Sequence, residues 1–116
     1  MPFYNEADFE WTEPPGHVRG YSRYLVGPHS GSRYFDFRVS SYPTGGLVQP
    51  HVHEVAEQVY YFIEGTGRAV CGAQTRDVAA GDVMFVPAGV VHSLECTSRQ
   101  DLRFVIVTTP SDDVPR

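Results

Sequence analysis

The segment HVHEVAEQVYYFIEG, which runs from His51 to Gly65, combines a His-x-His pair with an apolar run. Residues at positions i and i+2 of a strand project from the same face of a sheet. His51 and His53 are therefore expected to present two imidazoles side by side. The apolar run VYYFI after Gln58 predicts a second strand, and a short turn at residues 54–57 brings that strand back beside the first.

Two further residues complete a set of four donors that suits one metal ion. Gln58 begins the second apolar run, and His92 comes from a distant segment, PAGVVH. Imidazole nitrogens with an amide oxygen suit a first-row divalent metal better than calcium or magnesium, which prefer oxygen ligands. Glu57 is the alternative oxygen donor if the turn slips by one residue, although neighbours on a strand face opposite sides.

Glycines and one proline punctuate the two histidine segments. The first reads Gly45, five residues, His51-x-His53, four residues, Gln58, six residues, Gly65; the second reads Gly81, five residues, Pro87-x-Gly89, two residues, His92. These blocks resemble the two motifs of the cupins. The resemblance implies an all-β fold, a double-stranded β-helix or jelly-roll barrel. By the same resemblance, four positions correspond to the family's metal ligands: His51, His53, Gln58 and His92.

Two positions depart from the family's pattern. The ligand after the histidine pair is most often glutamate in the cupins, and here that position is Gln58. The family's asparagine after the last histidine is replaced by Cys96, so the support that this asparagine gives is not expected. Cys96 is interpreted as a small buried thiol, with a soft neighbour of the metal as the alternative.

Short apolar runs at near-regular spacing predict an all-β domain. Nine strands are expected, near residues 22–26, 33–42, 47–53, 58–63, 67–71, 74–78, 83–86, 91–97 and 102–108. The chain is interpreted as an aromatic arm at residues 1–20, a single barrel domain at 21–110 and a polar tail at 111–116. Gly65 and Gly67 are expected to supply the positive φ of a tight turn.

Composition narrows the class of protein. A chain of 116 residues with 41% hydrophobic and 20% charged residues is typical of one folded domain. The net charge of −5 and the absence of a basic run argue against nucleic-acid binding. The apolar runs are too short to span a bilayer, and the N-terminus does not resemble a secretory signal. The two cysteines, Cys71 and Cys96, form no disulfide framework, so a cytoplasmic location is expected.

Counting by two along each strand predicts which side chains share the barrel interior. They are Tyr60 and Phe62 with Gln58, Leu94 and Cys96 with His92, and Leu47 and Gln49 with His51. Tyr60 is the candidate catalytic residue, because its phenol is placed to donate to a metal-bound anion or to act as a general acid. The alternative is a core aromatic with a satisfied hydroxyl.

Charged and polar residues outside the motif have plainer interpretations. Arg38 is expected either to clamp an anion at the barrel mouth or to lie solvated at the surface. His17 and His29 lie in segments rich in glycine and proline and are expected to be exposed to solvent.

The donor set predicts the kind of ligand. Three imidazoles and one amide are neutral, so a divalent metal bound by them keeps its full charge in a low-dielectric interior. Such a site favours anionic, bidentate ligands such as 2-oxo and hydroxy acids. One divalent transition metal per chain is expected, and iron, manganese, nickel, copper and zinc are all compatible.

Two classes of function remain open. The resemblance implies an enzyme that acts on a small anionic organic or sugar-derived acid, of the dioxygenase, isomerase or uronate-linearising type. The alternative is a non-catalytic module that binds a small ligand in the barrel.

A homodimer is also expected. A small open barrel leaves sheet edges and apolar faces that proteins seldom leave bare. The residues available to cover them are the aromatic arm before Pro14 and the outward-facing Val59, Tyr61 and Ile63.

Overall fold

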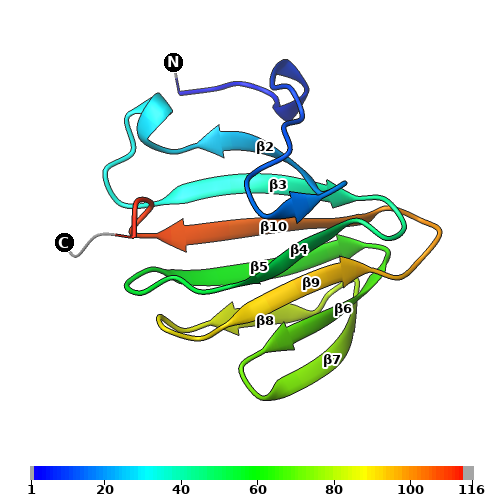
Figure 1. The fold of residues 1–116 in the computed structure, drawn as a ribbon. Coiled ribbons are helices and arrows are strands. Elements are labelled where there is room, and N and C mark those ends of the chain that lie inside the picture. The colour runs from blue at the N-terminus through cyan, green and yellow to red at the C-terminus, as the bar shows by residue number, and fades with distance from the viewer. Residues whose placement is uncertain (1, 114–116) are drawn as a thin grey trace.

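Ten strands, separated by turns that contain glycine and proline, pair into two antiparallel sheets of five strands each in the computed structural model, which describes residues 2–113 (Figure 1). One sheet has the order β1-β4-β9-β6-β7 and the other the order β2-β3-β10-β5-β8. The strands are β1 His17–Val18, β2 Tyr21–Val26, β3 Asp36–Tyr42, β4 Leu47–His51, β5 Glu57–Glu64, β6 Thr66–Cys71, β7 Gln74–Ala79, β8 Val83–Val86, β9 His92–Cys96 and β10 Leu102–Thr109. The chain crosses repeatedly between the sheets, so the expectation of an all-β jelly-roll barrel is confirmed.

All nine expected strands are present, and the structure adds the two-residue strand β1. β3 begins at Asp36 rather than near residue 33, and β4 ends at His51 rather than at His53. The helices of the described residues are two short 3-10 turns, η1 Glu6–Asp8 and η2 Pro28–Ser30, and neither is long enough to cross a membrane. Residues 114–116 of the expected polar tail lie outside the described residues.

The two glycines after β5 act in different ways. Gly65 has φ +76°, as expected, and a Cβ on it would lie 2.5 Å from the carbonyl oxygen of Asp101. Gly67 does not adopt a positive φ, so that part of the expectation is wrong. It is needed for close packing instead, because a Cβ there would lie 2.7 Å from a methyl carbon of Leu102.

Strict alternation places the expected side chains of β5 and β9 in the core. The buried residues of these two strands are Gln58, Tyr60, Phe62, His92, Leu94 and Cys96. The four apolar ones pack with Phe104, Leu102 and Tyr42 in a single hydrophobic cluster between the sheets. A polar pair, Gln58 and His92, therefore lies at one end of an apolar barrel interior.

The alternation expected for β4 is wrong. Val48 is buried with 5% of its surface exposed, whereas Gln49 is exposed and Leu47 is only half-buried. The pairing of β4 with β9 shifts register between Val48 and His51, so an irregularity of the bulge type separates them. Such a bulge reverses which face the residues before it occupy.

The N-terminal arm lies against the outer face of the second sheet. The carboxylate of Glu6 pairs with Arg23 on β2 at 3.2 Å and with Arg103 on β10 at 3.3 Å. The guanidinium carbon of Arg23 lies 4.3 Å from the ring centroid of Trp11. The arm is thus held by cation–π and ionic contacts to its own barrel.

Candidate metal centre

Three histidines converge at one end of the space between the sheets. His51 ends β4 and is paired across the ladder with His92, the first residue of β9, and His53 follows two residues after β4. The ring centroid of His51 lies 4.1 Å from that of His92 and 5.2 Å from that of His53. One ligand nitrogen from each ring lies within 4.8 Å of the others, a spacing that suits a single metal ion.

Gln58 adds a side-chain oxygen to the three imidazoles. Its side chain is buried, and its Oε1 lies 2.9 Å from Nε2 of His92. The orientation of the amide is fixed at both ends, because Nε2 donates to Oγ1 of Thr108 and the hydroxyl of Tyr60 donates to Oε1. The neighbouring Glu57 is exposed, so the amide and not that carboxylate faces the histidines.

The hydrogen bonds leave ring nitrogens with free lone pairs. Nδ1 of His51 lies 2.8 Å from the carbonyl oxygen of Gln49, and Nδ1 of His92 lies 3.0 Å from that of Val90. Carbonyl oxygens can only accept, so in each ring the proton is on Nδ1. Nε2 of a neutral His92 is then an acceptor that faces a second acceptor, the oxygen of Gln58, at 2.9 Å.

Nε2 of His53 is buried and has no hydrogen-bond partner among the described residues. Buried polar atoms without partners are rare, and they need a physical explanation. A cation between these converging lone pairs satisfies all of them at once. The donor set therefore fits a divalent transition metal held by imidazole nitrogens and one neutral oxygen.

Burial keeps two of the histidines in the form that binds metal. Desolvation is the main cause that lowers the pKa of His92 to about 4; the Val90 carbonyl opposes the change, and the nearby His51 and His53 contribute to it. Desolvation and His51 also lower the pKa of His53. Both rings are neutral at physiological pH, as metal ligation requires.

The low pKa of His92 predicts an acid-sensitive metal-free protein. Between its unfolded pKa of 6.5 and its folded pKa of about 4, the unfolded chain binds a proton that the folded chain does not. Stability is therefore lost as pH falls through this window, by roughly 3 kcal/mol over its full width. Urea unfolding of the metal-free protein at pH 7 and at about pH 4.5 measures the loss, and His92→Ala should remove most of it. An unchanged unfolding midpoint in the wild type would contradict the expectation.

Tyr60 lies next to the histidine cluster. Its side chain is 2% exposed, and its hydroxyl donates to Oε1 of Gln58 at 3.4 Å. Burial raises the pKa of this phenol far above its ordinary value, although the positive charge of Arg38 opposes the rise. The phenol therefore stays protonated and acts as a donor, not as a base.

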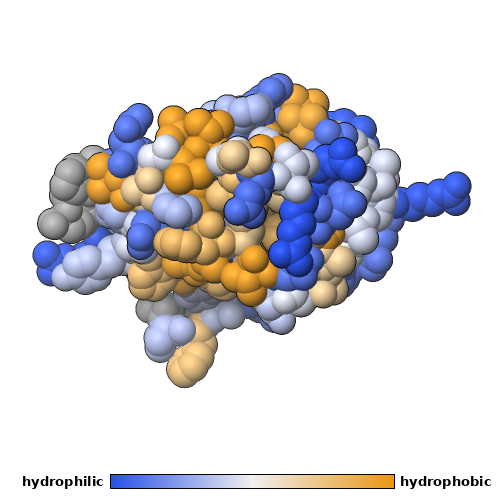
Figure 2. Space-filling view, turned by 90° about the horizontal axis from the view of Figure 1, so that it is seen from below, coloured by the Kyte–Doolittle hydropathy of each residue, from blue (hydrophilic) through white to orange (hydrophobic). Residues whose placement is uncertain are grey.

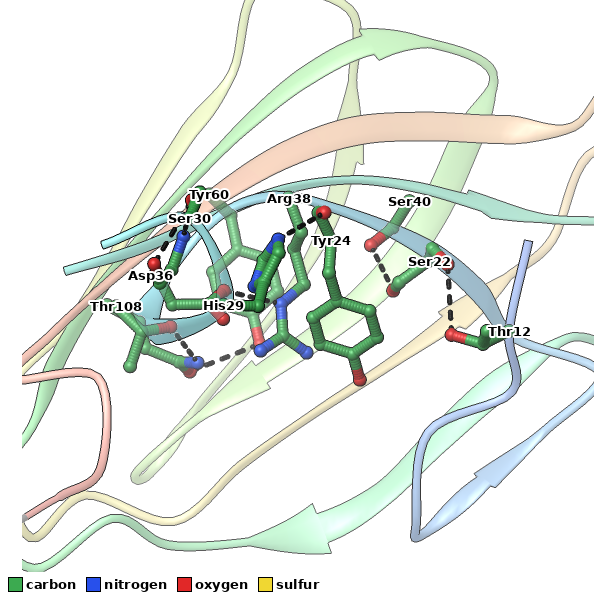
Figure 3. A network of polar contacts seen from close by, with 12 residues as sticks. Thr12, Ser22, Tyr24, His29, Ser30, Asp36, Arg38, Ser40, Tyr60 and Thr108 are labelled. Carbon is green, nitrogen blue, oxygen red and sulfur yellow. Dashed lines mark hydrogen bonds and ion pairs between the residues drawn. The ribbon is translucent and has the colours of Figure 1, made fainter. Parts of the chain in front are cut away.

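Two of the three histidines, His51 and His53, line a cavity of about 390 Å³ together with Tyr24, Arg38, Tyr60 and Thr108. Figure 3 shows Arg38 and Tyr24 side by side in this polar network, with Asp36 and Tyr60 close to them. Of the two interpretations of Arg38, the structure supports a position in the cavity over a solvated one, because the side chain is only 21% exposed.

The remaining polar residues of the sequence analysis have clear positions. His17 is half-buried, lines the same cavity, and packs its ring edge-on to Tyr42 at 5.7 Å, so the expectation that it is exposed is wrong. His29 is exposed as expected. Cys96 is buried at the far end of β9, where its thiol contacts the backbone of Ser98 and Gln100, so it is not a neighbour of the histidines.

The C-terminal segment holds the loop that follows His53. The carboxylate of Asp113 accepts hydrogen bonds from the backbone N–H groups of Glu54, Val55 and Ala56 at 2.9, 2.7 and 2.6 Å. These bonds lower the pKa of Asp113. Asp113 is not among the residues predicted from the sequence, because the contact joins positions more than fifty residues apart and no local pattern marks it.

Replacing Asp113 with alanine is expected to loosen this loop and weaken metal binding by ~10-fold, as for residues that orient metal ligands. Asp113→Asn retains one acceptor oxygen and is expected to lose less. The measurement is a titration of metal against a competing chelator, paired with hydrogen exchange of the amides of residues 54–56. Wild-type metal affinity and wild-type protection in Asp113→Ala would show that the carboxylate does not position His53.

The chain matches a protein-family model and several known proteins. Residues 38–108 match the model of a family described as Cupin domain, and this range contains all four converging residues. An "Oxalate-binding protein" from Thermotoga maritima is 37% identical over 65 residues, which are 56% of this chain and 54% of that protein. The chain therefore spans about half the length of the curated relatives it matches.

Two solved structures share the architecture. The polyketide cyclase RemF from Streptomyces resistomycificus has a TM-score of 0.82 and 26% identity, over 94% of this chain and 79% of that chain. A predicted oxalate decarboxylase from Thermotoga maritima has a TM-score of 0.81 and 25% identity, over 90% of this chain and 96% of that chain. The similarity extends over nearly the whole chain, in agreement with the jelly-roll topology described above.

Proposed function

The chain belongs to the cupin domain family, and on that premise we propose that it is a metal-dependent protein acting on a small anionic organic or sugar-derived acid. His51, His53, His92 and Gln58 are the proposed ligands of one divalent metal. The observation that carries the proposal is the 2.9 Å contact between Nε2 of His92 and Oε1 of Gln58, which is a contact between two acceptors because the Val90 carbonyl assigns the ring proton to Nδ1.

The neutral donors decide which ligands the site attracts. A metal bound by imidazoles and an amide keeps its double charge, and it would supply Lewis-acid chemistry to an oxygen ligand in an open position. An anion with two adjacent oxygens, such as a 2-oxo or 2-hydroxy acid, complements the positive charge of the metal and can bind it through both oxygens. Iron, manganese, nickel, copper and zinc all suit these donors.

Tyr60 is the proposed catalytic residue. Its phenol stays protonated at neutral pH and already donates toward the oxygen of Gln58. A ligand bound beside Gln58 therefore meets a hydrogen-bond donor, which can stabilise negative charge or deliver a proton. The dioxygenase, isomerase and uronate-linearising types of reaction all remain within this proposal.

A non-catalytic role in binding a small acid is the second candidate. The curated relative named "Oxalate-binding protein" supports it, since that protein is 37% identical over about half of this chain. Both roles place an acid on the metal, and they differ in whether the acid is changed. The effect of removing the Tyr60 hydroxyl distinguishes the two roles, because an enzyme that uses Tyr60 as a proton donor needs this hydroxyl and a binding module does not.

The test is a ligand screen on protein loaded with Mn²⁺, Fe²⁺ or Zn²⁺. Carboxylic, 2-oxo, 2-hydroxy and uronic acids are added, binding is followed by calorimetry, and products are followed by NMR. The enzymatic proposal expects binding and turnover, with turnover reduced ~100-fold or more by Tyr60→Phe. Binding without turnover of any acid would favour the binding module, and absence of both would contradict the proposal.

We also propose that the protein is a homodimer whose interface is the uncovered part of the second sheet. On β5, Val59 pairs directly with Phe85 of β8, and Tyr61 pairs with Val83. These four side chains face outward and are between 37% and 63% exposed. The arm lies against β2 and β10 and leaves this apolar face bare.

The uncovered face continues around the edge of the barrel. Between β7 and β8 the surface opens in a groove of about 540 Å³, where Val78, Met84 and Phe85 lie beside the polar Gln74, Arg76 and Asp82. Figure 2, seen from the side on which these strands lie in Figure 1, shows apolar side chains gathered across the middle of the molecule. A second copy offers the same apolar face, so a twofold pairing of the two faces covers both.

The dimer makes a direct prediction. Sedimentation velocity at micromolar concentration should show a dimer for the wild type and a monomer for Tyr61→Glu/Phe85→Arg, because truncated or charged hot spots cost ~2 kcal/mol or more each. Bound metal should be unchanged, since neither side chain lines the metal cavity. A wild-type protein that sediments only as a monomer would rule out this assembly.

The proposed location is the cytoplasm. Both cysteines are free, as reducing conditions would keep them.

A further inference from the structure

Arg38 occupies an unusual place for a charged side chain, because it lies on the face of β3 that turns into the barrel. Its neighbours on that face, Asp36 and Ser40, are both buried. A buried or half-buried charge is stable only when it is paired. Asp36 supplies the pairing, with its Oδ1 2.8 Å from Nε of the arginine.

The guanidinium is fixed on a second side by an aromatic ring. Its central carbon lies 4.3 Å from the ring centroid of Tyr24, on the neighbouring strand β2. The ion pair and the ring together hold the group in one orientation within the cavity (Figure 3). An ordered guanidinium loses less entropy when it binds an anion than a mobile surface arginine does.

The ion pair leaves most of the donors of Arg38 free. Within residues 2–113, its hydrogen bond to Asp36 uses Nε, and its two terminal nitrogens donate to no other described side chain. Those two nitrogens form the fork that binds a carboxylate with two parallel hydrogen bonds. The remaining donors are therefore the ones best suited to an anion in the cavity.

The strand ladder places this fork across the cavity from the metal ligands. Arg38 pairs with Ile106 on β10, and Ile106 pairs in turn with Tyr60 on β5. Two strand spacings thus separate the backbones of Arg38 and Tyr60, which is about 10 Å. Gln58 is the next inward residue on β5, so the arginine and the proposed metal ligands approach the same space from different strands.

We propose that Arg38 is the second anchor of the site and binds the distal carboxylate of a ligand whose other end chelates the metal. This rests on the proposed function and narrows its substrate class to dianionic 2-oxo or 2-hydroxy acids of four or more carbons. A two-carbon dianion uses both carboxylates on the metal and does not extend to the arginine. A monoanion has no group to place there.

The test compares acids that differ in the distal group. Protein loaded with Mn²⁺ is titrated calorimetrically with L-malate and 2-oxoglutarate, which carry a distal carboxylate, and with L-lactate and oxalate, which do not extend beyond the metal. Wild type should bind at least one of the longer dianions ~10-fold more tightly than lactate. Arg38→Gln should remove that advantage and change the affinity for lactate and oxalate less than ~2-fold.

Two further variants make the result decisive. Asp36→Asn/Arg38→Gln avoids leaving a buried carboxylate unpaired, and it should behave like Arg38→Gln if the latter does not fold. Arg68→Gln removes an arginine that is 62% exposed on β6, outside the cavity, and should bind every acid as the wild type does.

Three outcomes would overturn the proposal. Unchanged affinity for both longer dianions in the Arg38 variants would show that the arginine does not touch the ligand. Equal losses for lactate and malate would show a general effect of charge and not a distal anchor. A wild type that holds Mn²⁺ yet binds none of the acids would overturn the proposed function together with this inference, whereas the first two outcomes leave the proposed function intact.

Discussion

Replacing His92 with alanine is expected to lower bound metal from about one equivalent per chain to well below it. His92 is 1% exposed, and its Nε2 lies 2.9 Å from the oxygen of Gln58, at the centre of the proposed donor set. Substitution of a residue that only orients a metal ligand typically lowers metal affinity ~10- to 100-fold. Loss of a ligand itself should therefore lower it ~100-fold or more. The far-UV circular dichroism should remain that of a β protein, because the apolar core of the barrel is untouched.

Two matched variants separate ligation from the loss of any histidine. His53→Ala removes a second proposed ligand and should lose metal as His92→Ala does. His29→Ala removes an exposed histidine outside the cavity and should retain it. Full metal retention in both His92→Ala and His53→Ala, measured by elemental analysis, would remove the assignment of the site.

Exchanging Gln58 for glutamate is expected to preserve metal binding and to weaken anion binding. The carboxylate should hold metal at least as tightly as the amide, and the hydroxyl of Thr108 can turn to donate to it where it now accepts. The added negative charge opposes an anionic ligand on the metal. Carboxylate affinity should therefore fall by ~1–3 kcal/mol, the size of a like-charge term at an effective dielectric near 20 or above.

Calorimetric titration of the wild type and Gln58→Glu with a small dicarboxylate or a uronate gives the measurement. Glu57→Gln is the control, because it changes an exposed neighbour on the opposite face of β5 and should leave both affinities unchanged. Equal or tighter anion binding by Gln58→Glu would show that the amide does not set the charge of the site. If Gln58→Glu leaves every property unchanged, Gln58 is not a ligand.

The inward facing of the candidate site residues was predictable on strands that alternate regularly and lie close to a motif. Gln58 and Tyr60 on β5, and His92 on β9, lie inside as simple alternation predicts. On β4 the same counting fails at Val48, because the irregularity before His51 reverses the facing of the residues that precede it. A bulge of this kind has no distinct composition, so alternation alone does not reveal it.

Residues that depend on long-range contacts were beyond a pattern-based prediction. The sequence left Arg38 with two interpretations, and only the packing of β3 against its neighbours places it in the cavity. Asp113 is linked to the loop after His53 by contacts that no local period encodes. His17 packs on Tyr42 because the short strand β1 pairs with β4, a pairing too brief to leave a periodic signal.

Elemental analysis of the protein, purified without chelator and without added metal, is the most direct test of whether the histidine cluster binds a divalent metal. We expect about one equivalent of a first-row divalent metal per chain, or its stoichiometric uptake when the stripped protein is incubated with Mn²⁺, Fe²⁺ or Zn²⁺. A folded protein that contains no such metal and takes up none of the three would contradict this expectation.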